Sequence, residues 1–98
     1  MFVVLVRYPN PDVVDPHREG HYAFIKRLTD EGINLMSGAM EPRVGGVIVA
    51  KIDSRARLEA LLEEDPFKKA GVATYEIVEF NARNGVLQSV MAETSVPG

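Results

Sequence analysis

Short runs of apolar residues separate polar stretches along this chain, and they predict four strands and two helices. The first run, Phe2 to Val6, is apolar at every position and predicts a strand covered on both faces. Strand patterns recur at Ile33 to Met40 and Gly46 to Ile52, and Ala73 to Ala82 alternates its larger apolar residues with polar ones. The short connection between the second and third runs predicts an antiparallel hairpin.

The first helix is expected from Asp15-Pro16, an N-cap followed by a proline, to about Asp30. Gly32 is suited to end it. Residues three and four positions apart form its apolar stripe: His21, Phe24, Ile25 and Leu28.

The second helix is capped by Asp53 or Ser54. Its apolar face consists of Leu58, Leu61 and Leu62. Asp65-Pro66 then repeats the cap-and-proline signal, with Phe67 expected in the core and Gly71 closing the turn.

The order β-α-β-β-α-β predicts an α+β fold of ferredoxin-like topology with a four-stranded antiparallel sheet. Right-handed crossovers put both helices on one face, so the other apolar face requires a second copy of the chain. We therefore expect a homodimer or higher homo-oligomer, built as a dimeric α+β barrel. Gly38, within the second strand, is expected to mark a bulge or a close approach of two backbones.

The 98 residues form one predicted domain, 1–98. Its tail, 83–98, is expected to be partly disordered or packed at the dimer interface, and Val86 to Met91 suits either a short helix or an extra strand.

Composition excludes several classes of function. A net charge of -3 gives no reason to expect nucleic acid, and the longest apolar run is too short to span a membrane. Without a signal peptide pattern, the default compartment is the cytoplasm. The chain has no cysteine, which excludes disulfides and thiolate chemistry.

The sequence predicts neither a metal nor a cofactor. His17 and His21 have a spacing that could hold zinc on a helix, but a third ligand is missing. No glycine-rich phosphate loop is present, and Gly45-Gly46 is better interpreted as part of the hairpin.

Topology predicts that His21, early in the first helix, meets Asp65, just after the second. An imidazole beside a carboxylate is held in one tautomer, and its protonated form is stabilised, as a general acid or base requires. Arg18 would anchor a carboxylate or hydroxyl of the substrate. Other residues expected at the same end, as contacts to a small-molecule ligand, are Tyr8, Gly38, Met40, Arg43 and Tyr75.

Each of these residues also has a purely structural interpretation. Asp65 would be an N-cap only, and His21 a half-buried histidine on an apolar helix face. Arg18 and Arg43 would be solvated surface residues, and the tyrosines would belong to the core with a polar tip.

Arg18-x-x-His21, Gly38, Asp65-Pro66-Phe67 and Ala70-Gly71-Val72 together resemble the YciI-like (YCII-related) family. The resemblance covers Phe2 to about Phe80. It implies a dimeric α+β barrel whose His21 and Asp65 form the active-site pair, with lyase or dehydrochlorinase chemistry on small cyclic or aromatic-derived compounds. The strand motif Ser37-Gly38-Ala39-Met40 departs from the many relatives that have proline after the glycine, and the hairpin is short.

Three functions remain open from the sequence. One is an enzyme that transfers protons through His21 and Asp65. Another is a module that binds or senses a small ligand without chemistry. The last is a cofactor-free oxygenase or isomerase that uses the aromatic residues of the interior cleft.

Overall fold

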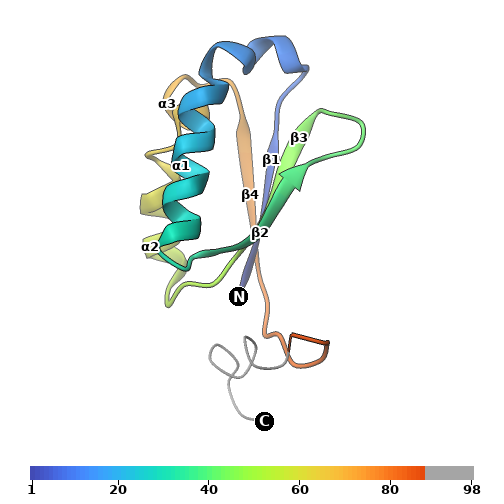
Figure 1. The fold of residues 1–98 in the computed structure, drawn as a ribbon, viewed down its shortest axis with the longest axis vertical. Coiled ribbons are helices and arrows are strands. Elements are labelled where there is room, and N and C mark those ends of the chain that lie inside the picture. Colours follow the sequence, from blue (N-terminus) through green and yellow to red (C-terminus); the bar gives the residue numbers. More distant parts are fainter. Residues whose placement is uncertain (88–98) are drawn as a thin grey trace.

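The computed structural model, which describes residues 1–87, has the predicted α+β fold of ferredoxin-like topology. Its strands form one antiparallel sheet in the order β2-β3-β1-β4. They are β1 (Phe2–Arg7), β2 (Asn34–Ala39), β3 (Gly45–Ala50) and β4 (Thr74–Glu79). The helices are α1 (Arg18–Asp30), α2 (Arg55–Leu62) and α3 (Pro66–Lys69), all on one face of the sheet (Figure 1).

The core lies between the sheet and these helices. Along β1, Phe2, Val4 and Val6 are buried against the helices, whereas Val3 and Leu5 on the other face are only half-buried in the single chain. The alternation follows from the pleat, which directs successive side chains to opposite faces. Residues from every layer complete the core, including Phe24, Leu28, Ile48, Leu58, Leu62 and Phe67.

The start of α1 differs from the sequence prediction. Instead of capping an α-helix, Asp15 belongs to a 3₁₀ turn, η2 (Asp15–His17), that follows another, η1 (Pro11–Val13). The two turns flank Val14, which is buried in the core and only 1% exposed. The tight turns allow this side chain to be buried, and the α-helix begins three residues later, at Arg18.

The other helix ends agree with the local signals. Gly32 has a φ of 76°, and its N–H donates to the carbonyl of Thr29 at the end of α1. Ser54, rather than Asp53, caps α2 by accepting from the N–H of Arg57 at 3.1 Å.

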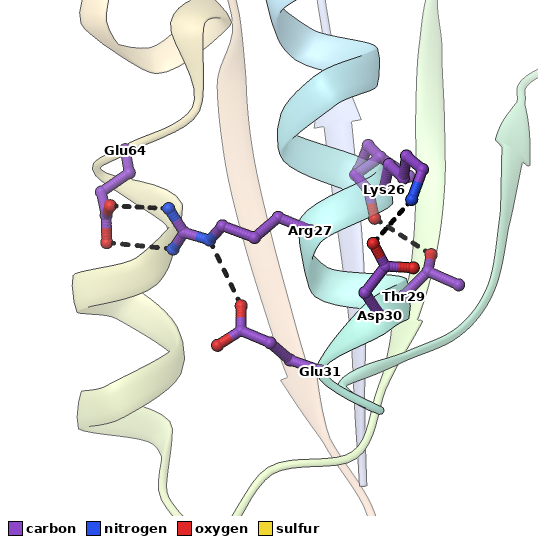
Figure 2. Close-up of polar contacts among 7 residues, drawn as sticks. Lys26, Arg27, Thr29, Asp30, Glu31 and Glu64 are labelled. Atoms are coloured by element: carbon purple, nitrogen blue, oxygen red, sulfur yellow. Dashed lines mark hydrogen bonds and ion pairs between the residues drawn. The ribbon is translucent and has the colours of Figure 1, made fainter.

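Arg27 connects α1 to the segment after α2. Its guanidinium donates to both carboxylate oxygens of Glu64, at 2.9 and 3.3 Å, and to Glu31 at 3.2 Å (Figure 2). The hydrogen bond and charge of Arg27 lower the pKa of Glu64. Arg27 therefore links α1 to Glu64, the residue that directly precedes Asp65.

Gly38 does not mark the irregularity of β2. The register of the β2–β3 ladder shifts between Asn34 and Met36, and a Cβ added to Gly38 would meet no atom within 4 Å. The close backbone approach is at Gly45, where a Cβ would lie 2.0 Å from the carbonyl oxygen of Val6. Gly45, at the start of β3, and not Gly38 is thus the glycine that the packing requires.

The helix or strand expected at Val86 to Met91 lies mostly outside residues 1–87. Within the described part, no helix is both long enough and apolar enough to cross a membrane.

Candidate active site

α1 begins and α3 lies at the same end of the sheet (Figure 1). His21, early in α1, meets Asp65, the N-cap of α3, at this end. His21 Nδ1 is 2.8 Å from Asp65 Oδ1, a hydrogen-bonding distance. The expected proximity of these two residues, 44 positions apart in sequence, is therefore present in the fold.

Gly20 permits this approach. A Cβ added at Gly20 would lie 3.0 Å from Cγ of Pro66, the first residue of α3. Glycine weakens a helix interior, and at this position it has a packing role, because it lets α1 come close enough to α3 for the adjacent His21 to reach Asp65.

Asp65 is completely buried, at 0% exposure, and its carboxylate is satisfied by three donors. Oδ1 accepts from the backbone N–H of Phe67 at 3.1 Å as well as facing His21. Oδ2 accepts from the hydroxyl of Tyr75 at 2.5 Å. The predicted N-cap is confirmed, and the same oxygen that caps α3 also holds the imidazole.

Tyr75, on β4, holds Asp65 through Oδ2, the carboxylate oxygen that does not face His21. Burial, followed by the hydrogen bond to Asp65, raises the pKa of the Tyr75 phenol far above its ordinary value of 10.0. The hydroxyl therefore stays protonated and remains a donor throughout the neutral range.

The contact with Asp65 fixes which nitrogen of His21 can react. Nδ1 must carry a hydrogen to donate to the carboxylate, so Nε2 of the neutral ring is the proton acceptor. The ring stacks on Phe67 with centroids 4.0 Å apart and planes inclined by 4°, which restricts its rotation. Its side chain is only 15% exposed.

His21 lies in the wall of a cavity of about 310 Å³ between α1 and the helix-facing side of β2 and β3. Small side chains on the sheet, Ser37, Ala39 and Gly46, leave room above the strands. The wall is largely apolar, with contributions from Val6, Val14, Ile25, Ile48 and Phe67.

Four of the expected ligand contacts line this cavity: Tyr8, Arg18, Gly38 and Arg43. Met40 and Tyr75 are not among the described residues that line it. Tyr75 lies instead behind Asp65, and the backbone N–H of Met40 bonds to Gly45 at the hairpin.

Arg18 is incompletely paired. Its Nη2 donates to Asp15, whereas its Nε is buried without a hydrogen-bond partner among residues 1–87. An unpaired buried donor is uncommon in folded proteins. Nε is enclosed by the protein, but Nη1 also has no partner among the described residues and is the donor left for a ligand.

The sequence did not indicate the roles of Ser37, Tyr22 or Phe67 at this site. Ser37 and the 59% exposed Tyr22 line the cavity, and Phe67 supports the His21 ring. Only Phe67 carried a sequence signal, its place in Asp65-Pro66-Phe67, which predicted burial but not stacking. Tyr22 carried none, and Ser37 appeared only in the strand motif Ser37-Gly38-Ala39-Met40, which assigned it no role.

The described residues contain no group of three or more His, Cys, Asp or Glu side chains able to hold a metal ion. His21 and Asp65 are an isolated pair. What the geometry provides is a proton acceptor, a fixed tautomer and arginine side chains around a mainly apolar cavity.

Comparison with solved structures gives a likeness in fold. A 5-chloro-2-hydroxyhydroquinone dehydrochlorinase from Burkholderia phenoliruptrix, in complex with 2,5-dihydroxybenzoquinone, superposes with a TM-score of 0.67. The match covers 82% of this chain and 93% of the dehydrochlorinase chain, at 18% sequence identity. No curated protein matches the sequence.

The family comparison is more direct, because it covers the whole sheet and all the helices. The model of the YCII-related domain matches residues 1–81, which include both His21 and Asp65. The chain therefore belongs to the YCII-related family.

Proposed function

We propose that this protein is a small-molecule enzyme in which His21 and Asp65 transfer protons by general acid–base catalysis. The reaction is of the lyase or dehydrochlorinase type, and the substrate is a small cyclic or aromatic-derived compound. The observation that carries the proposal is the 2.8 Å contact from His21 Nδ1 to Asp65 Oδ1, made by a ring that lines a cavity.

Each residue has a role in this proposal. Nε2 of His21 accepts a proton from the substrate, and Asp65 stabilises the resulting imidazolium. Tyr75 and the N–H of Phe67 hold the carboxylate in place. Tyr8, Arg18 and Arg43 bind the substrate, and the backbone of Gly38 adds to the cavity lining.

For a chlorinated hydroxyhydroquinone, such as the substrate of the dehydrochlorinase, the proton transfers balance without an oxidant. His21 moves a proton from a hydroxyl oxygen to the chlorine-bearing carbon, which becomes tetrahedral. Chloride then leaves with the C–Cl electron pair while a second hydroxyl loses its proton and becomes a carbonyl. The net change is loss of HCl, and a hydroxyquinone is the product.

The test is chloride release from 5-chloro-2-hydroxyhydroquinone by the wild type and by His21→Asn. We expect His21→Asn to lose about 10²–10⁴-fold in kcat/KM, the usual contribution of a general acid or base. The matched control is His17→Asn, since His17 is the other histidine and is not among the described residues that line the cavity. It should remain within about twofold of wild type, because its imidazole takes no part in the proton transfers assigned to His21.

Other outcomes separate the alternatives. Unchanged turnover in His21→Asn would refute the proposal. Turnover that survives this substitution but disappears in Tyr75→Phe would favour an oxygenase or isomerase that uses the aromatic residues. Binding of 2,5-dihydroxybenzoquinone without any turnover would favour a ligand-binding module.

The assembly proposed with this function is a homodimer in which a second copy covers the outer face, the side of the sheet away from the helices. Support comes from its apolar side chains, which pair across the strands: Met36 with Val49, Val49 with Val3, and Val3 with Val78. Met36 and Val78 are 56% and 43% exposed in the single chain. A continuous apolar surface of this kind is typical of an interface.

A further inference from the structure

The charged groups of the cavity are distributed unevenly. Apart from His21, the charged residues in its lining are Arg18 and Arg43, and none of the described lining residues is an aspartate or glutamate. Asp65 lies behind His21, and its oxygens face Phe67, His21 and Tyr75. The lining thus offers a ligand more donors than acceptors.

Both arginines have donors to spare. Arg18 gives Nη2 to Asp15, but its Nη1 has no partner among the described residues, and 32% of the side chain is exposed. Arg43 makes no ion pair or hydrogen bond through its side chain in the same part of the chain, although ion pairs engage Arg7, Arg27, Arg55 and Arg57. Guanidinium groups in this state are suited to oxyanions, which accept two parallel hydrogen bonds from the planar fork.

Ser37 adds a neutral donor from the sheet. Its Oγ accepts a hydrogen bond from Nδ2 of Asn34 at 3.0 Å, so its own hydrogen remains available. Asn34 also donates to Thr29, which in turn donates to the carbonyl of Ile25. This chain of contacts fixes the position of Ser37, which is one of the residues that line the cavity.

The size and wall of the cavity limit what the donors can bind. A cavity of about 310 Å³ is near the lower end for ligand pockets and has about twice the volume of one that holds benzene, so it suits a single ring with several substituents. Val14 and Ile25 provide apolar contacts, and the small residues Ala39 and Gly46 leave the strands accessible to a flat molecule.

From these observations we infer that the cavity selects a single-ring compound carrying an oxyanion, and that Arg18 and Arg43 recognise its negative charge. The inference rests on the proposed function for the location of the site, but it concerns binding rather than proton transfer. It assigns Arg18 and Arg43 as the residues that distinguish ionised from neutral ligands of the same shape.

The test compares 4-hydroxybenzoate with 4-hydroxybenzamide by calorimetry on the full chain, because the two probes share ring and size but differ in charge. We expect the wild type to bind the carboxylate at least about tenfold more tightly, from charge-assisted hydrogen bonds. Arg18→Gln and Arg43→Gln should each reduce this preference about tenfold or more. The preference should also fall with added salt.

Arg57→Gln is the matched control, since Arg57 is an exposed arginine of α2 paired with Asp53 and absent from the described lining. It should keep the wild-type preference. Equal affinity for the two probes, binding of neither, or an unchanged preference in both Arg18→Gln and Arg43→Gln would each overturn the inference.

The outcome is separable from that of the proposed function. Anion selectivity that survives in His21→Asn, in a protein without turnover, would support the inference while refuting the acid–base mechanism. If turnover depends on His21 but the protein shows no binding preference for ionised probes, the acid–base mechanism would be supported and the inference on anion recognition would be refuted.

Discussion

Asp65 combines two roles that substitutions can separate. As an N-cap it needs only an oxygen for the N–H of Phe67, which asparagine also supplies. As the partner of His21 it needs a negative charge, which asparagine lacks. The fully buried carboxylate binds the backbone, the imidazole and Tyr75 together.

We predict that Asp65→Asn will keep the fold but no longer fix the tautomer of His21. Its stability should stay within about 1 kcal/mol of wild type, since the cap is retained. Asp65→Ala should cost about 1–3 kcal/mol more, because the buried donors lose their acceptor. The ¹⁵N shifts of the His21 ring will report Nδ1–H alone in the wild type and a mixture in Asp65→Asn. A single unchanged tautomer in Asp65→Asn would leave Asp65 as a structural cap.

Local signals at the residue scale identified part of this site. Asp65-Pro66 could be recognised because an N-cap and its proline are neighbours in sequence. The role of Tyr75 could not, since its hydroxyl reaches Asp65 only when β4 lies beside α3. Sequence alone therefore predicted a contact between Tyr75 and a ligand, whereas the fold turns this side chain toward the carboxylate.

At the scale of elements, the same dipeptide gives two different structures. Asp65-Pro66 begins a capped turn of helix, whereas Asp15-Pro16 lies inside a 3₁₀ turn and the carboxylate of Asp15 binds Arg18. The difference follows from Val14, whose burial in the core determines how the chain turns before α1. Tertiary packing thus overrides a local capping preference, and sequence patterns predict that a helix exists more reliably than where it begins.

The packing of α1 on α3 gives a prediction at this scale. Gly20→Val should push the helices apart, because even a Cβ at this position lies 3.0 Å from Pro66. We expect a loss of about 1–3 kcal/mol in the free energy of unfolding, the usual cost of overpacking. The ¹⁵N shifts of His21 should change as its contact with Asp65 lengthens.

Glu19→Val controls for the effect of a β-branched residue on the same helix, since Glu19 is exposed. It should change stability by less than about 1 kcal/mol, the range of helix propensities. Equal denaturation midpoints for the two variants, with the His21 signals unmoved, would show that Gly20 has no positioning role.

At the scale of the whole molecule, the order of elements determined the sheet and the convergence of His21 with Asp65. Topology was predictable because two right-handed crossovers leave few alternatives for a β-α-β-β-α-β chain. The volume and floor of the cavity were not predictable, since they depend on small residues such as Ala39 and Gly46 in its lining. Those residues have no periodic pattern that distinguishes a cavity floor from an ordinary strand.

The outer face of the sheet carries the last prediction, that the chain is a dimer in solution. Sedimentation at micromolar concentration should give twice the chain mass of 10.8 kDa. Val78→Lys should shift the mass toward that of the single chain, because it places a charge among apolar residues that a second copy would cover. Ala56→Lys, on the exposed surface of α2, should leave the dimer unchanged. A wild-type protein that sediments at 10.8 kDa would contradict the prediction, and the apolar face would then need another explanation.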